Sequence, residues 1–291
     1  MQEFFAAILL ALAALAAPAA SALAAPGETE PYAVPRSAVH DIQTGEGRAY
    51  KLYVATPPGY GRPENAERRY PVIYLNDGDL FFLAATGEPL LSYYNGVLEE
   101  TIVVGISYAV GENPIASRQR DLTPVRDDSF QAETGGGADY LRVLKLGIIP
   151  LIEDAYRADP RRRTLAGHSF GATFGAYVLL TEPDLFANYI LVSPALWYAG
   201  RAIAGFESLY AQSHDDLKAR VYMAVGDLEG PKGGLKAVDM VNDEIAFAAR
   251  LRSRRYKDFI LRDEILDGGV THATAFPIAY LRALEWMFPA K

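Results

Sequence analysis

The sequence predicts an α/β fold in which helices cover both faces of a mostly parallel central sheet. Three observations predict it. Short apolar runs rich in β-branched residues recur along the chain, stretches with helical periodicity separate them, and the length of 291 residues suits one α/β domain or two small ones. Strands that are buried on both faces are apolar throughout, so runs of this type indicate parallel pairing.

The expected strands differ in how clearly they alternate. Residues 50–56 alternate between apolar and polar side chains, as a half-buried strand does. The others are short apolar runs that we expect to be buried strands: residues 72–75, 102–106, 164–168, 189–192 and 221–225, with a last strand that begins at residues 259–261. In an open parallel sheet, the ligand site lies at the carboxyl ends of the strands.

Helical periodicity marks several of the segments between these strands. We expect helices at residues 138–156, 172–180, 236–252 and 275–287. Pro150 should kink the first of them, because proline has no amide hydrogen for a helical hydrogen bond. Residues 108–137 form a long connection with Pro, Gly and mixed charge, which predicts a lid or substrate platform over the active edge.

The N-terminal residues have a different composition from the rest. Residues 4–16 are apolar, and Ala-rich sequence with Ala-x-Ala patterns follows to residue 25. This is typical of a secretory signal peptide, although Glu3 stands in a region that usually carries Lys or Arg. An uncleaved anchor is the alternative, but a membrane span needs about 20 apolar residues. We predict a signal peptide at 1–25, a lead-in at 26–47 and one domain at 48–291, in a periplasmic or secreted protein without a membrane partner in its mature form.

The charge and cysteine content exclude some functions. The chain has 28 Lys and Arg against 36 Asp and Glu, a formal net charge of −8. A nucleic-acid partner would need a basic face, so we expect none. The chain has no cysteine, so an exported form has no disulfides and depends on its core for stability.

Residues 167–171 read Gly-His-Ser-Phe-Gly, which matches the G-x-S-x-G pattern of a catalytic serine. The pattern lies between an expected strand and an expected helix, which is the context that it requires. Glycines on both sides remove side chains that would collide in so tight a turn. We therefore predict that Ser169 is a nucleophile.

A serine nucleophile needs a base to take its proton and an acid to orient that base. In hydrolases of this architecture, the chain order is serine, acid, histidine. Of the four histidines, His40 precedes the sheet, His168 adjoins the serine with its side chain directed away, and His214 precedes the strand that should present the acid. His272 follows the last strand and is the predicted base.

Two carboxylates compete for the role of the acid. Both follow the strand at 221–225, in the segment Gly226-Asp227-Leu228-Glu229. Many α/β-hydrolases place the acid three residues after the glycine, which favours Glu229 over Asp227. Asp267, which lies later but still before His272, is a more distant candidate.

An oxyanion hole needs two backbone N–H donors. One is the residue after the nucleophile, here Phe170, and the other comes from the loop after an early strand. That loop reads Leu75-Asn76-Asp77-Gly78-Asp79, so the second donor is predicted to be the N–H of Asp79 or Gly78.

The chain resembles the putative-esterase family, which holds esterase D-like enzymes and the siderophore trilactone esterases. The segments that carry the resemblance span residue 50 to the C-terminus: Val72-Ile73-Tyr74-Leu75-Asn76-Asp77-Gly78-Asp79, Val104-Gly105-Ile106, Arg120-Asp121-Leu122-Thr123-Pro124, Gly135-Gly136-Gly137-Ala138, the serine motif, Ser193-Pro194-Ala195-Leu196-Trp197 and Gly226-Asp227-Leu228-Glu229. The Arg-Asp-Leu-Thr-Pro and Ser-Pro-Ala-Leu-Trp segments are the most specific to the periplasmic trilactone-esterase branch.

The resemblance implies an α/β-hydrolase that cleaves carboxylic esters without a metal or an organic cofactor. It also implies a substrate role for the basic segment that holds Arg118 and Arg120, since a guanidinium pairs with catecholate or carboxylate oxygens. Trp197 follows the strand after the nucleophile helix and is expected to line the acyl pocket. In the siderophore branch the acid can be weak or absent, so a Ser–His dyad is an alternative to a triad with Glu229.

These features together predict a serine esterase for a small-molecule ester, with siderophore-type trilactones as the leading substrate. Three alternatives remain open at this level. They are an esterase for general or feruloyl-like acyl esters, an acyltransferase on the same fold, and an exported binding protein on a hydrolase scaffold.

Overall fold

The computed structural model describes residues 31–45, 47–234 and 238–290. Residues 34–291 form one compact unit, and residues 1–33 form a separate one. The predicted signal peptide, residues 1–25, lies outside the described residues.

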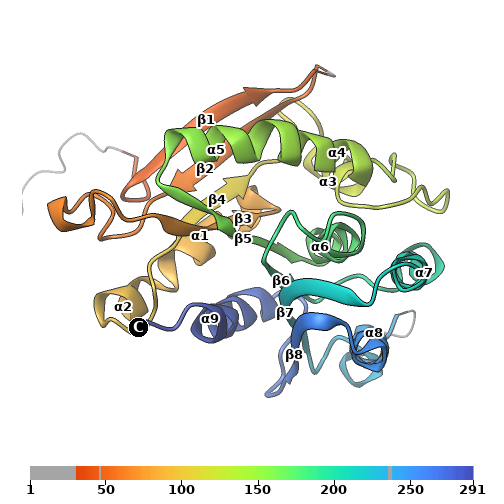
Figure 1. Ribbon diagram of the computed structural model, residues 1–291. Coiled ribbons are helices and arrows are strands. Elements are labelled where there is room, and N and C mark those ends of the chain that lie inside the picture. The colour runs from red at the N-terminus through yellow and green to blue at the C-terminus, as the bar shows by residue number, and fades with distance from the viewer. Residues whose placement is uncertain (1–30, 46, 235–237, 291) are drawn as a thin grey trace, which may run out of the picture. The chain divides into compact units, whose positions relative to one another are not determined.

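The described strands form one eight-stranded sheet in the order β1-β2-β4-β3-β5-β6-β7-β8 (Figure 1). Strands β3 to β8 are parallel to one another. At one edge of the sheet, β2 pairs antiparallel with β4, and β1 pairs antiparallel with β2. Their bounds are Ser37–Gln43 for β1, Ala49–Ala55 for β2, Tyr70–Leu75 for β3, Ile102–Ile106 for β4, Ala158–His168 for β5, Asn188–Val192 for β6, Asp216–Gly226 for β7 and Lys257–Leu266 for β8.

The first strand was not predicted from the sequence, which placed these residues in the lead-in. β1 pairs along its whole length with β2, and only Ile42 on it is buried. An edge strand with one face in solvent carries few apolar residues, so its pattern resembles that of a loop. The folded unit therefore begins before residue 48.

Helices cover both faces of the sheet, as predicted. Residues of α1 and α9 pack in the core on one face, and residues of α4 to α8 pack in the core on the other (Figure 1). The helix bounds are Gly78–Gly87 for α1, Leu90–Tyr94 for α2, Pro114–Asp121 for α3, Gly137–Val143 for α4, Ile149–Ala155 for α5, Phe170–Thr181 for α6, Tyr198–Tyr210 for α7, Met240–Arg254 for α8 and Ala275–Met287 for α9. Short 3-10 turns lie at Pro63–Asn65 and Pro231–Gly233.

Strand β3 shows why its sequence is apolar throughout. Val72 and Tyr74 belong to the core on one face of the sheet, whereas Ile73 and Leu75 belong to the core on the other. Successive side chains of a strand point to opposite faces, and helices cover both faces here. The whole strand is therefore buried and ends at the edge where the serine motif lies.

The expected helix at 138–156 is interrupted. A π-helical turn at Leu144–Ile148 separates α4 from α5, and Pro150 lies in the first turn of α5. Proline is tolerated in a first turn because the N–H groups there have no intrahelical partner. The irregularity falls just before the proline, where the sequence predicted a kink.

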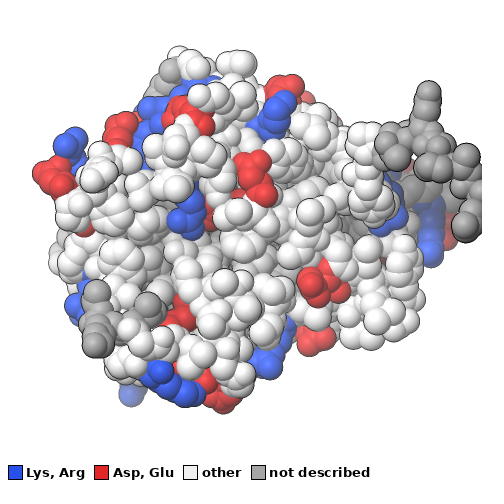
Figure 2. Space-filling model, turned by 180° about the vertical axis from the view of Figure 1, so that it is seen from behind, with Lys and Arg blue, Asp and Glu red and all other residues white. Residues whose placement is uncertain are grey.

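The surface is mixed in charge on the face shown in Figure 2. Basic and acidic side chains are interspersed there among uncharged ones, and the described residues on that face form no continuous basic patch. Within the described part of the chain, no helix is both long enough and apolar enough to cross a membrane.

Candidate active site

Ser169 lies in the sharp turn between β5 and α6. Its backbone has φ 58° and ψ −121°, a strained conformation for a residue with a side chain. A Cβ on Gly167 would lie 2.3 Å from the carbonyl carbon of Gly171, so this turn can close only with glycine at residue 167. The amide of Ser169 donates to the carbonyl of Val192 on β6, at 3.0 Å. The turn thus presents the serine at the carboxyl edge of the sheet, as the motif predicted.

His272 and Glu229 are brought together by the loops after β8 and β7. Nδ1 of His272 lies 2.5 Å from Oε2 of Glu229. The Glu229 carboxylate is fully buried, and its other oxygen accepts hydrogen bonds from the Ser193 hydroxyl at 2.6 Å and the Gly226 amide at 2.7 Å. A proton on Nδ1 that is held by Glu229 leaves Nε2 of the ring free to accept a proton.

Asp227, the competing acid, has a different role. One of its oxygens accepts hydrogen bonds from the amides of Gly269, at 3.0 Å, and Val270, at 2.8 Å, and the other pairs with Lys232. These bonds hold the loop that carries His272. The third candidate, Asp267, is exposed in the same loop. The structure therefore places Glu229, and not Asp227, at the histidine.

His168 was not predicted to take part. Its Nε2 nevertheless lies 2.8 Å from the carbonyl oxygen of His272. A carbonyl only accepts hydrogen bonds, so Nε2 of His168 carries the proton. Burial, together with the nearby His272 and Arg118, lowers the pKa of His168 to about 3, so the ring stays neutral. The residue before the nucleophile thus holds the backbone of the predicted base.

The two histidine rings place His272 next to the serine turn. Their centroids are 4.2 Å apart. Among the described residues, the Ser169 hydroxyl makes no hydrogen bond to the His272 ring. Catalytic hydrogen bonds in free enzymes are often long and tighten only when a substrate binds.

The predicted oxyanion donors lie at the starts of two helices. Phe170 is the first residue of α6, and Gly78 and Asp79 are the first two residues of α1. Within the described residues, the N–H groups of these three residues have no hydrogen-bond acceptor. The two segments are in contact, because Nδ2 of Asn76 donates to the carbonyl of Gly171 at 3.1 Å. Both helix starts can therefore direct N–H groups toward one developing negative charge.

The two arginines on α3 lie in different surroundings. Arg118 donates to both carboxylate oxygens of Asp77, at 2.6 and 3.2 Å, and to the carbonyl of His168 at 3.1 Å. Arg120 is buried and donates to both oxygens of Asp121, at 2.8 and 3.1 Å. Its Nη1 donates to the carboxylate of Glu112. Residues two apart on a helix face different sides, so one arginine reaches the serine turn and the other does not. This placement argues against the predicted substrate role of Arg120.

Trp197 lies at the start of α7, where its half-buried ring centroid is 6.1 Å from that of Phe170. The long segment 108–137 reaches the same place. Its Phe130 ring lies 6.0 Å from that of Phe170, and its Val125 carbonyl accepts a hydrogen bond from Tyr198 at 2.8 Å. This segment is therefore packed against the serine turn, where a substrate platform was expected.

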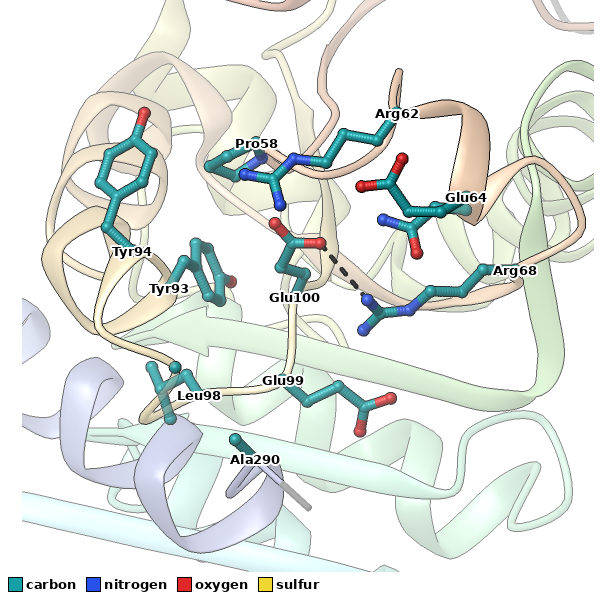
Figure 3. Close-up of a pocket in the computed structure, with 12 residues that line it drawn as sticks. Pro58, Arg62, Glu64, Arg68, Tyr93, Tyr94, Leu98, Glu99, Glu100 and Ala290 are labelled. Carbon is teal, nitrogen blue, oxygen red and sulfur yellow. Dashed lines mark hydrogen bonds and ion pairs between the residues drawn. The ribbon is translucent and has the colours of Figure 1, made fainter.

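A cavity of about 540 Å³ lies elsewhere, between the segments that lead into β3 and β4 (Figure 3). It is at the amino ends of these strands, whereas Ser169 is at the carboxyl ends. Glu100 points into this cavity but already accepts a hydrogen bond from the Gly59 amide and pairs with Arg68 at 3.5 Å. The cavity is therefore separate from the candidate active site.

Most of this unit is similar to known proteins. Residues 44–259 match the family described as "Putative esterase". The chain belongs to this family. The esterase is 30% identical over 221 residues to the ferri-bacillibactin esterase BesA of Bacillus subtilis, covering 70% of this chain and 74% of that one. It is also 30% identical over 192 residues to the siderophore enterobactin esterase of Emericella nidulans, covering 60% and 62%.

Solved structures support the fold. The siderophore hydrolase EstB from Aspergillus nidulans matches the esterase with a TM-score of 0.76 and 22% identity, over 90% of this chain and 98% of that one. The predicted α/β-hydrolase fold is confirmed, as is the predicted resemblance to siderophore esterases. The protein is a carboxylic ester hydrolase.

Proposed function

We propose that the protein hydrolyses siderophore-type esters through an acyl-enzyme formed on Ser169. The observation that carries this proposal is the 2.5 Å contact between His272 and the buried Glu229, beside a serine held in a strained turn. A buried carboxylate fixes the tautomer of a histidine and stabilises its protonated form, which is what a serine nucleophile requires. The free helix starts at residues 78–79 and 170 supply the donors for the oxyanion.

In the first half of this reaction, the Ser169 oxygen attacks the ester carbonyl carbon while Nε2 of His272 takes the hydroxyl proton. The carbonyl oxygen becomes negatively charged and accepts hydrogen bonds from the N–H of Phe170 and that of Asp79 or Gly78. The C–O bond to the leaving alcohol then breaks, and His272 returns the proton to that alcohol. In the second half, water adds to the acyl-enzyme with the same histidine as base, which releases the acid and regenerates Ser169.

The substrate class is proposed from the relatives. Two of them are named as esterases for ferri-bacillibactin and enterobactin, and the chain spans 74% and 62% of those two proteins. The aromatic residues at the serine turn, Phe130, Phe170 and Trp197, suit an acyl group with a flat ring. We also propose that the protein is exported, since the pattern of residues 1–25 is typical of a signal peptide.

The proposal is tested with wild type and Ser169→Ala on a panel of esters. The panel contains p-nitrophenyl acetate, a feruloyl ester and a macrocyclic catecholate trilactone in metal-free and ferric forms, with products identified by mass spectrometry. We expect Ser169→Ala to remain folded and to lose turnover on every substrate. Equal turnover by the variant would contradict the nucleophile, and transfer of the acyl group to an added alcohol instead of water would favour the acyltransferase.

Labelling by a fluorophosphonate separates enzyme from binding protein. We expect wild type to be labelled at Ser169, with the peptide identified by mass spectrometry, and Ser169→Ala to stay unlabelled. An unlabelled wild type that still binds the trilactone would favour the binding-protein alternative.

A further inference from the structure

The Arg118 guanidinium connects the two segments that carry the oxyanion donors. Its Nε and Nη2 hold the Asp77 carboxylate, and the same Nη2 donates to the carbonyl of His168, the residue before the nucleophile. We propose that Arg118 and Asp77 are positioning residues that set the spacing of the oxyanion hole. This inference rests on the proposed serine mechanism.

The conformation of Asp77 supports this role. Asp77 precedes the first residue of α1, where an aspartate usually caps the helix with its side chain, but its side chain makes no capping bond. Its backbone is left-handed instead, with φ 56° and ψ 42°, which is uncommon for a residue with a side chain. The carboxylate is thereby fully buried and turned toward Arg118. The local sequence alone does not favour this geometry, so the ion pair helps to maintain it.

The carboxylate also lies against the serine turn. A Cβ placed on Gly171 would be 2.9 Å from Oδ2 of Asp77, so only glycine leaves room for the aspartate there. On the other side, a Cβ on Gly78 would lie 2.6 Å from the backbone of Gly105 and Ile106 in β4. The segment 77–79 is thus fixed between β4 and the serine turn, and Arg118 binds both Asp77 and that turn.

Arg118 has little capacity left for a substrate. Its side chain is 19% exposed, and the guanidinium carbon lies 5.4 Å from the centroid of the Phe170 ring. Phe170 supplies one oxyanion donor, so the arginine contacts both donor segments directly. A displacement of about 1 Å at such a site can reduce turnover by about a hundredfold. Loss of the pair should therefore act on the transition state and not on substrate binding.

The experiment compares Arg118→Met, Asp77→Asn, the double variant and Arg118→Lys with wild type on a neutral p-nitrophenyl ester. We expect kcat of each single variant to fall about 10- to 100-fold with KM within about twofold. A displaced oxyanion donor weakens stabilisation of the transition state, where the negative charge develops, and leaves substrate binding unchanged. The double variant should be no worse than the singles, since the pair acts as a unit. Arg118→Lys should be intermediate, because an ammonium cannot form the same planar fork.

A second readout is the rate of phosphonylation by a fluorophosphonate, which also forms a charged oxygen in the oxyanion hole. We expect it to fall by the same factor as kcat/KM. The control is Glu112→Gln, which removes a carboxylate partner of Arg120 near the same helix and should lower thermal stability without changing kcat. Melting temperatures of all variants identify any that fail to fold. If Arg118→Met fails to fold, the kinetics of folded Arg118→Lys test the inference in its place.

Two outcomes overturn the inference. The first is an unchanged kcat in folded Arg118→Met or Arg118→Lys, and the second is a KM that rises while kcat stays constant, which would make Arg118 a substrate-binding residue. Failure of the proposed function itself looks different, because wild type would then show neither turnover nor labelling at Ser169.

Discussion

Glu229 and Asp227 are separated by one residue and have different roles. Glu229 is buried and bonded to His272, while Asp227 binds the amides of the loop on which His272 lies. The first contact acts on the imidazole and the second only on its backbone support. The two residues should therefore differ sharply in their effect on turnover although they share one loop.

We expect Glu229→Gln to lower kcat by about 10²- to 10⁴-fold, because an amide cannot stabilise the imidazolium and can favour the wrong tautomer. Asp227→Asn keeps an oxygen that can accept from Gly269 and Val270, so kcat should fall only a few-fold. Steady-state kinetics on a p-nitrophenyl ester measure both. A larger loss for Asp227→Asn would reverse the assignment, and a negligible loss for Glu229→Gln would support the Ser–His dyad.

His168 predicts a pH dependence of stability. Burial, with the nearby His272 and Arg118, lowers its pKa from 6.5 to about 3 in the folded state. Below pH 6.5 the unfolded chain therefore binds a proton that the folded protein does not, and acid favours unfolding. This residue's contribution is complete above pH 6.5 and is lost as the pH falls toward 3, at about 1.4 kcal/mol per pH unit.

The test is urea unfolding of wild type and His168→Gln between pH 5 and pH 7.5. Glutamine can donate to the His272 carbonyl but does not titrate. The difference in the free energy of unfolding should change by about 1.4 kcal/mol per pH unit below pH 6.5 and be constant above it. Parallel curves for the two proteins would show that His168 does not remain neutral on folding.

At the scale of elements, the strand–turn–helix unit of β5 and α6 determines where chemistry can occur. Gly167 and Gly171 are required for different reasons. The first faces the backbone of the turn itself, and the second faces the carboxylate of Asp77. The turn is therefore shaped from within by one glycine and positioned against its neighbour by the other.

Gly167→Ala should destabilise the protein by about 1–3 kcal/mol or more and reduce kcat, since its Cβ would overlap the backbone of Gly171. The matched control is Gly205→Ala in α7, where a Cβ meets nothing within 4 Å. That change should stabilise the helix by about 0.5–1 kcal/mol and leave kcat unchanged. Chemical denaturation and ester kinetics on both variants provide the measurement, and equal effects on stability would contradict the steric argument.

At the scale of the whole molecule, the sheet begins earlier than its apolar pattern suggested. The edge strand β1 buries Ile42 and connects to the end of α5 through His40, whose ring lies 2.7 Å from the Tyr156 hydroxyl. These contacts make residues 37–43 part of the domain. Residues 1–33, in contrast, form a separate unit.

Two truncations test this boundary. A chain that begins at Val34 should keep kcat within twofold and its melting temperature within about 2 °C. A chain that begins at Arg48 lacks β1, and loss of the buried Ile42 with the β1 ladder should lower the melting temperature by about 5 °C or more. Differential scanning calorimetry compares them, and an unchanged melting temperature for the shorter chain would show that β1 contributes no stability.

The sequence by itself determined the parallel sheet, and it predicted the nucleophile and the base. Strand patterns, the glycines around Ser169 and the chain order that leaves only His272 are all local or countable features. It also ranked Glu229 above Asp227, but only by their distance from Gly226. The edge strand β1 was missed because a strand with a solvent-exposed face lacks a long apolar pattern.

Only the tertiary structure decided which side chains meet. The bond from Glu229 to His272, the contact of His168 with the backbone of the base and the pairing of Arg118 with Asp77 each join residues at least 41 positions apart. Side-chain direction after a strand depends on a few backbone angles, and the left-handed conformation of Asp77 is uncommon for any residue with a side chain. Such contacts are fixed by the packing of several loops at one edge of the sheet, so they cannot be predicted from local sequence patterns.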